Sequence, residues 1–379
     1  MMRRHPWPIS SGSAQSGTTE VALDGRGTVA WSVSIPTRMA SELVADADGR
    51  WFLRTPDLIA AGDRSALLWQ WEGRAEEPCL LDDGSLVVPL RDEIAALDPA
   101  SGEARWSIAG RHVHAAPLPT GGVSVIRVRN HDSTLVVLDG DGMTRWEADV
   151  AGSVAPPVGR ADGMVILASE RWVEAFDADG TPRWRTSVGG FDVPPDENRA
   201  FTTQPIDLDG QRVIVGADAY DWLGFLMLDP ASRSASRWPA DSRLTVAPQS
   251  PLALRRHPSP LALAVPFHAT LRLIGLDGAA GSSSAVEIWT ETLQRPPYAC
   301  AIDPQGHVAV AYTESPELHD PYLWGDGAKE MRGRSGVALL EPDGRRRWTW
   351  DAPGPLGGFA IGAGGEILVT SEGRLWALT

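Results

Sequence analysis

The chain has 379 residues, and its 49 acidic and 34 basic side chains give a formal net charge of −15 at pH 7. This charge argues against a general nucleic-acid binder, because phosphate contacts need a positively charged surface. Hydrophobic residues make up 43% and charged residues 22%, which allows a sizeable core and excludes wholesale disorder. The sequence contains no apolar run of about 18 residues that would predict a membrane span.

Residues 1–17 are small and polar, and we expect them to form a disordered tail. They include basic residues but neither the apolar stretch of a secretory signal nor a cysteine that could carry a lipid. Cys79 and Cys300 are the only cysteines, which is too few for a disulfide framework. We therefore expect two reduced thiols and a cytoplasmic protein, with residues 18–379 forming one domain.

The chain repeats a unit in which a strand, a glycine-containing turn and a tryptophan follow one another. In one unit an alternating apolar strand ends at Asp98, Gly102 lies in the turn, and the next strand carries Trp106. Glycine suits such a turn because it tolerates positive φ. Eight tryptophans occupy this position along the chain: Trp31, Trp69, Trp106, Trp146, Trp184, Trp238, Trp289 and Trp348.

Two further short apolar runs precede each unit, for example at residues 85–88 and 165–168. Four short antiparallel strands per repeat are typical of a propeller blade. The pattern predicts an all-β, eight-bladed β-propeller of four-stranded antiparallel blades. The C-terminal residues 359–378 supply three strands of the last blade, and residues 28–35 at the N-terminus supply the fourth and close the ring. Residues 21–24 also resemble a third strand, so two segments compete for that place.

The unit at residues 96–106 resembles the PQQ-like β-propeller repeat of the quinoprotein dehydrogenase and BamB-like superfamily. The resemblance extends over nearly the whole chain from about residue 20. It implies that the eight tryptophans dock between neighbouring blades on glycine turns, here Gly102, Gly142, Gly180 and Gly344. The adjacent cysteines that cover the quinone in the dehydrogenases are missing, as are the export signal and lipid-bearing cysteine of the scaffold proteins. We therefore expect no PQQ or other cofactor, and neither familiar role transfers directly.

Insertions gather in the connections between the second and third strands of the blades and between consecutive blades. If the strands of each blade are lettered a to d from the channel outward, these connections open on one face of the propeller, which we call the b–c face. Loops carry function more often than the scaffold does. We expect a small molecule or peptide, or a protein partner, to bind there. The predicted ligand-binding residues are Arg54, Arg91, Arg129, Arg171, Asp218, Tyr220, Trp222, Tyr322 and Trp324.

The chemistry of these residues suits an anionic or zwitterionic ligand. The planar arginine fork binds a carboxylate or phosphate in two places, and the loop aromatics lie off the repeat pattern and could cover an apolar remainder. Two functions stay open: a binding or scaffold propeller, and a non-redox lyase, cyclase or hydrolase with its site at the top of the channel. In the second case His131, His268 or His319 would carry the proton.

No motif favours a metal site. The weak spacing of His112 and His114 could place both rings on one strand face, but it is not an established zinc pattern. We therefore predict no metal, no nucleic acid and no membrane among the partners.

Overall fold

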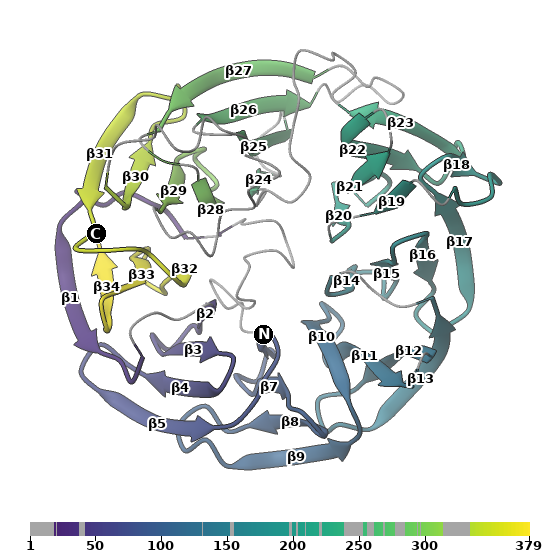
Figure 1. The fold of residues 1–379 in the computed structure, drawn as a ribbon, viewed down its shortest axis with the longest axis horizontal. Helices are drawn as coiled ribbons and strands as arrows, with labels where there is room; N and C mark the ends of the chain where they lie inside the picture. The colour runs from purple at the N-terminus through teal and green to yellow at the C-terminus, as the bar shows by residue number, and fades with distance from the viewer. Residues whose placement is uncertain are drawn as a thin grey trace.

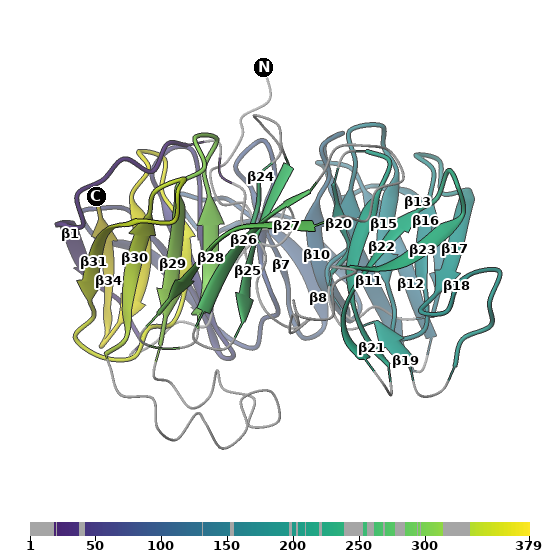
Figure 2. The same cartoon turned by 90° about the horizontal axis from the view of Figure 1, so that it is seen from above.

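The computed structural model describes residues 19, 21–37, 42–130, 132–151, 155–196, 199–201, 204–208, 210–219, 222–238, 253–255, 261–267, 270–276, 285–293, 295, 297–313 and 334–379. Within these ranges the regular elements are strands, and the strands form eight antiparallel sheets. The sheets surround a common axis (Figure 1), and the edge-on view shows a flat ring (Figure 2). The prediction of an all-β propeller built from four-stranded antiparallel sheets is confirmed.

We number the sheets in chain order and give the strands of each sheet from the innermost outward. Sheet 1 contains β2 (Glu42–Ala45), β3 (Trp51–Thr55), β4 (Leu58–Gly62) and β5 (Leu67–Glu72). Sheet 2 contains β6 (Cys79–Leu80), β7 (Leu86–Pro89), β8 (Glu93–Leu97) and β9 (Ala104–Ala109). Sheet 3 contains β10 (His112–Pro117), β11 (Val123–Arg129), β12 (Asp132–Leu138) and β13 (Thr144–Val150).

Two of the next three sheets carry an additional strand. Sheet 4 contains β14 (Val158–Gly159), β15 (Val165–Ala168), β16 (Val173–Phe176), β17 (Pro182–Ser187) and β18 (Gly190–Phe191). Sheet 5 contains β19 (Arg199–Phe201) and β20 (Ile206–Asp207), which both pair with β21 (Val213–Ala219), then β22 (Trp222–Asp229) and β23 (Ser234–Trp238). Sheet 6 contains β24 (Ala253–Arg255), β25 (Leu261–Phe267), β26 (Thr270–Leu276) and β27 (Ala285–Thr292).

The last two sheets complete the ring. Sheet 7 contains β28 (Pro297–Ile302), β29 (Val308–Tyr312), β30 (Gly336–Leu340) and β31 (Arg346–Asp351). Sheet 8 contains β32 (Phe359–Ile361), β33 (Ile367–Ser371), β34 (Arg374–Leu378) and, as its outer strand, β1 (Val29–Ser34). As the sequence predicted, β1 pairs with β34, so a strand from the start of the described chain completes the sheet formed by its last three strands.

The structure also decides which segment supplies the third strand of sheet 8. Strand β34 pairs with both β33 and β1. Residues 21–27 instead run to sheet 7, where the Leu23 amide donates to the buried Asp303 carboxylate at 2.9 Å. Gly27 then packs against Trp348, whose indole N–H donates to the Gly25 carbonyl at 2.9 Å. This segment therefore supplies a tryptophan-docking turn rather than a strand.

The core is divided into layers between neighbouring sheets. One layer joins sheets 1 and 2 around Phe52 and Leu80, and another joins sheets 2 and 3 around Cys79 and Val125. A repeat tryptophan lies at the edge of each of these layers, for example Trp69 in the first. Burial of apolar area between sheets is thus the main force that holds the ring together.

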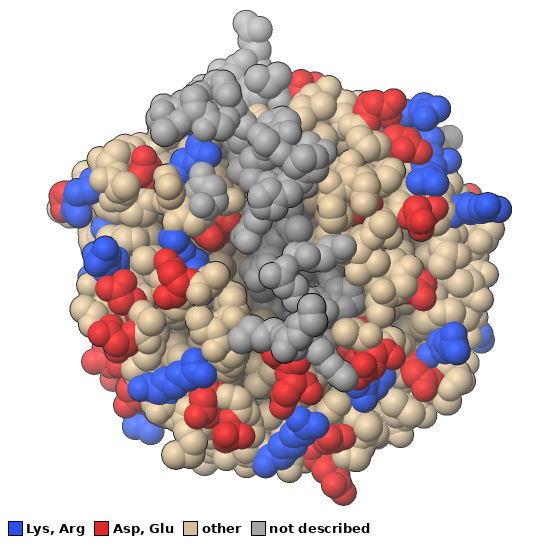
Figure 3. All heavy atoms as spheres, turned by 180° about the vertical axis from the view of Figure 1, so that it is seen from behind, with Lys and Arg blue, Asp and Glu red and all other residues tan. Residues whose placement is uncertain are grey.

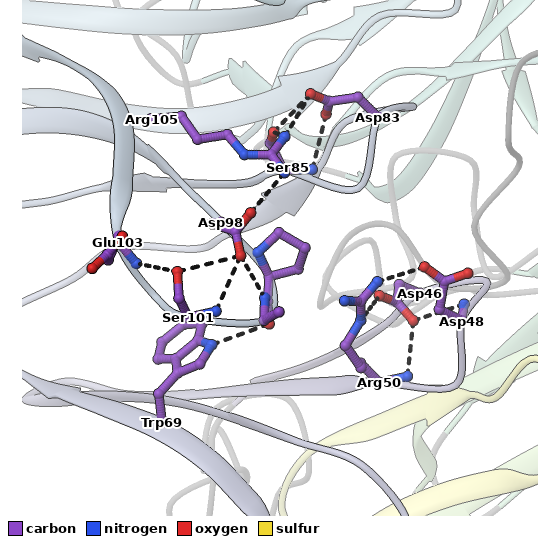
Figure 4. Close-up of polar contacts among 12 residues, drawn as sticks. Asp46, Asp48, Arg50, Trp69, Asp83, Ser85, Asp98, Ser101, Glu103 and Arg105 are labelled. Carbon is purple, nitrogen blue, oxygen red and sulfur yellow. Dashed lines mark hydrogen bonds and ion pairs between the residues drawn. The ribbon is translucent and has the colours of Figure 1, made fainter.

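Five repeat tryptophans in the described ranges dock on a glycine turn of the next sheet: Trp69, Trp106, Trp146, Trp289 and Trp348. A Cβ built on Gly27, Gly102, Gly142, Gly180 or Gly344 would lie only 2.6–2.9 Å from the nearest atom of the facing indole, and all five glycines have positive φ. Figure 4 shows one such junction, where the Trp69 indole N–H donates to the Pro99 carbonyl at 3.1 Å. Arg105 supports this turn through ion pairs with Asp83 and Asp98. The glycines are required here both for the turn and for the close approach of the ring.

Both cysteines are buried, and neither forms a disulfide. Cys79 lies on β6 and Cys300 on β28, the inner strands of sheets 2 and 7. Burial raises the pKa of the Cys79 thiol well above its ordinary value. The structure joins neither thiol in a disulfide, as the sequence predicted.

Replacement of Gly142 by Ala tests the docking contact, with Gly121→Ala as the matched control. Both glycines have φ +81°, but a Cβ on Gly121 meets nothing within 4 Å, whereas one on Gly142 would lie 2.7 Å from Trp106. We expect Gly121→Ala to lower the free energy of unfolding by about 1 kcal/mol, the cost of left-handed backbone. Gly142→Ala should cost roughly 2 kcal/mol more, because the indole must move. Equal losses in urea unfolding would contradict the docking role.

Thiol titration tests the state of the cysteines. The denatured, unreduced protein should yield two thiols, and the folded protein should react slowly because both sulfur atoms are buried and Cys79 stays protonated. A titration of zero thiols after denaturation would show a disulfide and refute this prediction.

Candidate functional site

A hollow of about 240 Å³ lies on the b–c face between sheets 2 and 3. Its walls come from three connections: the one from β5 to β6, the one from β7 to β8, and the one from β9 to β10. The residues that line it are Arg74, Glu76, Leu90, Arg91, Asp92, Arg111 and His112. Three arginines, a histidine and two acidic residues therefore line one small space.

Two of these arginines have no counter-ion within the described part of the chain. Arg91 lies in the exposed β7–β8 connection, and Arg111 directly precedes β10. Neither makes an ion pair with a described residue, whereas Arg74 lies 3.8 Å from Glu76. A guanidinium without a counter-ion keeps its full hydrogen-bonding capacity for a carboxylate or phosphate.

His112 forms the buried floor of the hollow. It is 2% exposed, and its Nδ1 lies 2.7 Å from the Gly110 carbonyl. Burial lowers its pKa, and the positive charges of Arg127 and Arg129 lower it further, although the contact with Gly110 opposes the shift. The ring is therefore neutral at pH 7 and donates from Nδ1 to the carbonyl.

A second polar group lies beside this hollow, toward the inner strands. Arg54 donates through Nη1 to both carboxylate oxygens of Glu42 at 2.7 and 2.8 Å, and through Nε to the Ala75 carbonyl at 2.8 Å. Burial raises the pKa of Glu42 to about 7; the Arg54 charge opposes this, and Glu77 and Glu76 add to it. Glu42 thus titrates close to neutral pH at the start of β2.

His114 belongs to the same neighbourhood. It has φ 56°, unusual for a residue with a side chain, and lies where the pairing of β10 with β11 shifts register. Burial lowers its pKa, while the charges of Glu77 and Glu76 act in the opposite direction. This backbone conformation at a sheet irregularity is typical of a site where the fold aims one side chain.

The structure separates the four predicted arginines. Arg91 lines the hollow, and Arg129, exposed at the end of β11, is close enough to influence the pKa of His112. Arg54 is already engaged by Glu42 and Ala75, and Arg171 donates to the Asp196 carbonyl at 3.2 Å on sheet 4. Ligand contacts by the last two stay a prediction and would require them to exchange existing bonds.

Two other predicted site residues lie on a hairpin of sheet 5. Asp218 lies on β21 and Trp222 on β22, on the two paired strands of one hairpin in sheet 5, and their backbones are described without their side chains. The remaining predicted residues lie outside the described residues: His131, Tyr220, His268, His319, Tyr322 and Trp324. The catalytic roles of the three histidines stay predictions.

Sequence reasoning missed Arg111 and Glu42, and it considered His112 only as a metal ligand. The signal was present, because Arg111 and His112 lie in a connection between blades, on the same face as Arg91. The sequence interpretation compared charges only at the tips between second and third strands. In the described ranges no group of three His, Cys, Asp or Glu side chains is placed to hold a metal ion.

Charge on the opposite side of the molecule is mixed. Acidic and basic side chains alternate around the described surface seen from behind (Figure 3), so no broad single-sign patch covers it. None of the described residues belongs to a helix that is long and apolar enough to span a membrane.

Comparison with known proteins gives the same fold. The structure of BamB from Moraxella catarrhalis aligns with a TM-score of 0.55 and 17% identity, over 93% of this chain and 100% of that one. Dihydro-heme d1 dehydrogenase NirN in complex with DHE aligns with a TM-score of 0.57 and 12% identity, over 93% of this chain and 75% of that one. At these identities the likeness establishes the propeller fold alone. A search of curated protein sequences found no match.

The family comparison is stronger evidence of relationship, because it matches the amino-acid sequence itself. The family described as outer membrane protein assembly factor BamB matches residues 15–160 and 90–244, which together span more than half of the chain. The resemblance that the tryptophan–glycine repeat predicted is confirmed, and the chain belongs to the BamB family of PQQ-like propeller proteins.

Proposed function

We propose that this protein is a binding propeller that captures an anionic group of a small molecule or peptide between sheets 2 and 3 on its b–c face. It works as a scaffold and not as a redox enzyme. The observation that carries the proposal is a pair of arginines, Arg91 and Arg111, that make no ion pair with a described residue and line one hollow with the buried His112. A carboxylate or phosphate is the chemical group that two convergent guanidiniums bind best.

The surroundings of the two arginines support an anion in preference to a cation. Arg129 adds a third positive charge within electrostatic reach of His112, and Arg74 lines the same hollow. Asp92 and Glu76 stand at the edge, so the site also suits a ligand that carries an amino group beside its acid. A peptide terminus or a zwitterionic metabolite combines these charges.

The size of the hollow and the family description support a binding role. At about 240 Å³ it holds one functional group and not a whole substrate, so a larger ligand would extend over the surrounding loops. The family takes its description from an assembly factor, a protein that works through partners. A cytoplasmic location is part of this proposal, and two cysteines that form no disulfide agree with a reducing compartment.

Sulfate, which keeps its charge over the working pH range, is the probe for the anion site. Arg91→Gln and Arg111→Gln should each weaken sulfate binding roughly tenfold, because each removes a charged hydrogen-bond donor. Titration at constant ionic strength, followed through the arginine side-chain N–H resonances by NMR, measures this. Arg183→Gln on β17 is the control, since that arginine is 63% exposed and remote from the hollow. Unshifted Arg91 and Arg111 resonances, or equal weakening by the control, would contradict the proposal.

The affinity for sulfate should rise as the pH falls. His112 is neutral at pH 7 because its pKa is lowered below the ordinary value of 6.5, and protonation adds a positive charge beside the arginines. Titrations from pH 7.5 to pH 5 should therefore show tighter binding at the acidic end. His112→Asn should flatten that dependence while leaving the arginines in place. A pH dependence unchanged by this substitution would exclude His112 from the site.

A further inference from the structure

The junction between sheets 8 and 1 differs from the five glycine-docked junctions in the turn that faces its tryptophan. Trp31 on β1 occupies the position held by Trp69, Trp106 and Trp348 elsewhere, so it faces the turn between β4 and β5. That turn contains no glycine: it runs Asp63-Arg64-Ser65-Ala66. The usual docking partner of the indole is therefore missing.

The facing turn is also shorter than its counterparts. The Asp63 amide donates to the Ala66 carbonyl, which leaves two residues in the loop. The equivalent bonds join Asp139 to Met143 and Asp98 to Glu103, with three and four residues between them. Buried Trp51 holds the short turn in place, because its indole N–H donates to the Asp63 carbonyl at 2.8 Å. The turn cannot swing outward to cover Trp31 without breaking that bond.

A cleft of about 500 Å³ opens beside the short turn. Trp31 lines it together with Arg64 and Ser65 from the short turn, Arg50 from the β2–β3 turn and Glu366 from the β32–β33 turn. At four other junctions the indole N–H donates to a turn carbonyl at 2.9–3.1 Å. The Trp31 indole donates to no described residue. The volume of the cleft lies within the range of roughly 300–1,000 Å³ typical of ligand pockets.

At the junction of sheets 4 and 5, an additional strand takes the place of the missing glycine turn. The turn that faces Trp184 also lacks glycine, and Arg233 takes positive φ there. The extra strand β18 supplies Phe191, whose ring centroid lies 5.9 Å from that of Trp184. No described aromatic ring takes the corresponding place at Trp31, which is half-buried against the core on its inner side.

We propose that the cleft at Trp31 binds a glycine-containing turn presented by a partner protein. Docked there, the turn places a glycine Cα on the indole face and a backbone carbonyl on the indole N–H, as the chain's own turns do at the other junctions. The same side chain in the same place on the blade selects the same chemistry. The partner thus completes the ring of tryptophan–glycine contacts at the point where the chain closes on itself.

One basic side chain at the cleft is placed to pair with an acidic residue of the incoming turn. Asp48 pairs with Arg50 at 2.5 Å, and the Asp63 carboxylate accepts from the Ser65 and Ala66 amides. Glu366 accepts from the Gly364 amide at 2.9 Å. Arg64 is exposed and makes no ion pair with a described residue, so it is the charge available to an incoming aspartate.

A cyclised peptide with the sequence of residues 98–103 tests the proposal, because it is the turn on which Trp69 docks in this protein. Added to the intact protein at millimolar concentration, it should shift the Trp31 indole N–H resonance in a saturable manner, with the resonance assigned through Trp31→Phe. The same peptide with Gly102→Val should bind at least tenfold more weakly, because a side chain there meets the ring. Trp31→Phe should weaken binding of the original peptide about fivefold, the loss of one hydrogen bond.

Lengthening the short turn supplies an independent readout. Insertion of one glycine between Ser65 and Ala66 should cover Trp31 from within, abolish peptide binding and raise the unfolding midpoint. Trp348→Phe, which alters a covered tryptophan, should leave peptide binding unchanged. An unshifted Trp31 resonance at saturating peptide, equal binding of the Gly102→Val peptide, or binding that survives the glycine insertion would each overturn the proposal.

Discussion

The contact between a tryptophan of one sheet and a glycine turn of the next organises this protein. Each sheet has four or five short strands and would be marginally stable alone, since the sheet buries its apolar side chains only against a neighbour. The indole docks where a side chain on the turn could not fit, as at Trp106 and Gly142, and its N–H fixes the register by donating to a turn carbonyl. The contact therefore sets both the spacing of the sheets and their angular order.

This constraint explains why both candidate binding regions lie between sheets. Connections on the b–c face are free to vary once the tryptophans hold the blades, and the hollow at Arg91 and Arg111 forms where three such connections meet. The cleft at Trp31 has the opposite origin, because a docking turn has lost one residue and its glycine. One region arises beside an intact framework and the other from a gap in it.

The sequence predicted the fold well because the repeat unit carries its own physical explanation. An apolar strand, a glycine turn and a tryptophan predict the docking contact, and the closing role of residues 28–35 followed from counting strands. The role of residues 21–27 could not be predicted, because the pattern of Leu23 and Asp24 fits a strand as well as a docking turn, and only the contacts with Asp303 and Trp348 decide. The sequence does contain the signal of the shortened turn, because Asp63 precedes Trp69 by one residue fewer than Asp139 precedes Trp146. The engagement of Arg54 by Glu42 depends on burial, which residue type alone does not give.

A pair of double-mutant cycles in unfolding free energy tests the central account most directly. One cycle combines Trp106→Ala with Gly142→Ala, and the other combines Trp31→Ala with Ser65→Gly. Residues in contact couple by roughly 0.5–3 kcal/mol, whereas independent residues add within about 0.5 kcal/mol. The account predicts strong coupling at the junction of Trp106, where the indole meets a glycine turn, and additive changes at the junction of Trp31, where the facing turn has no glycine. Additive changes at Trp106 and Gly142, or coupling of equal size in both cycles, would contradict it.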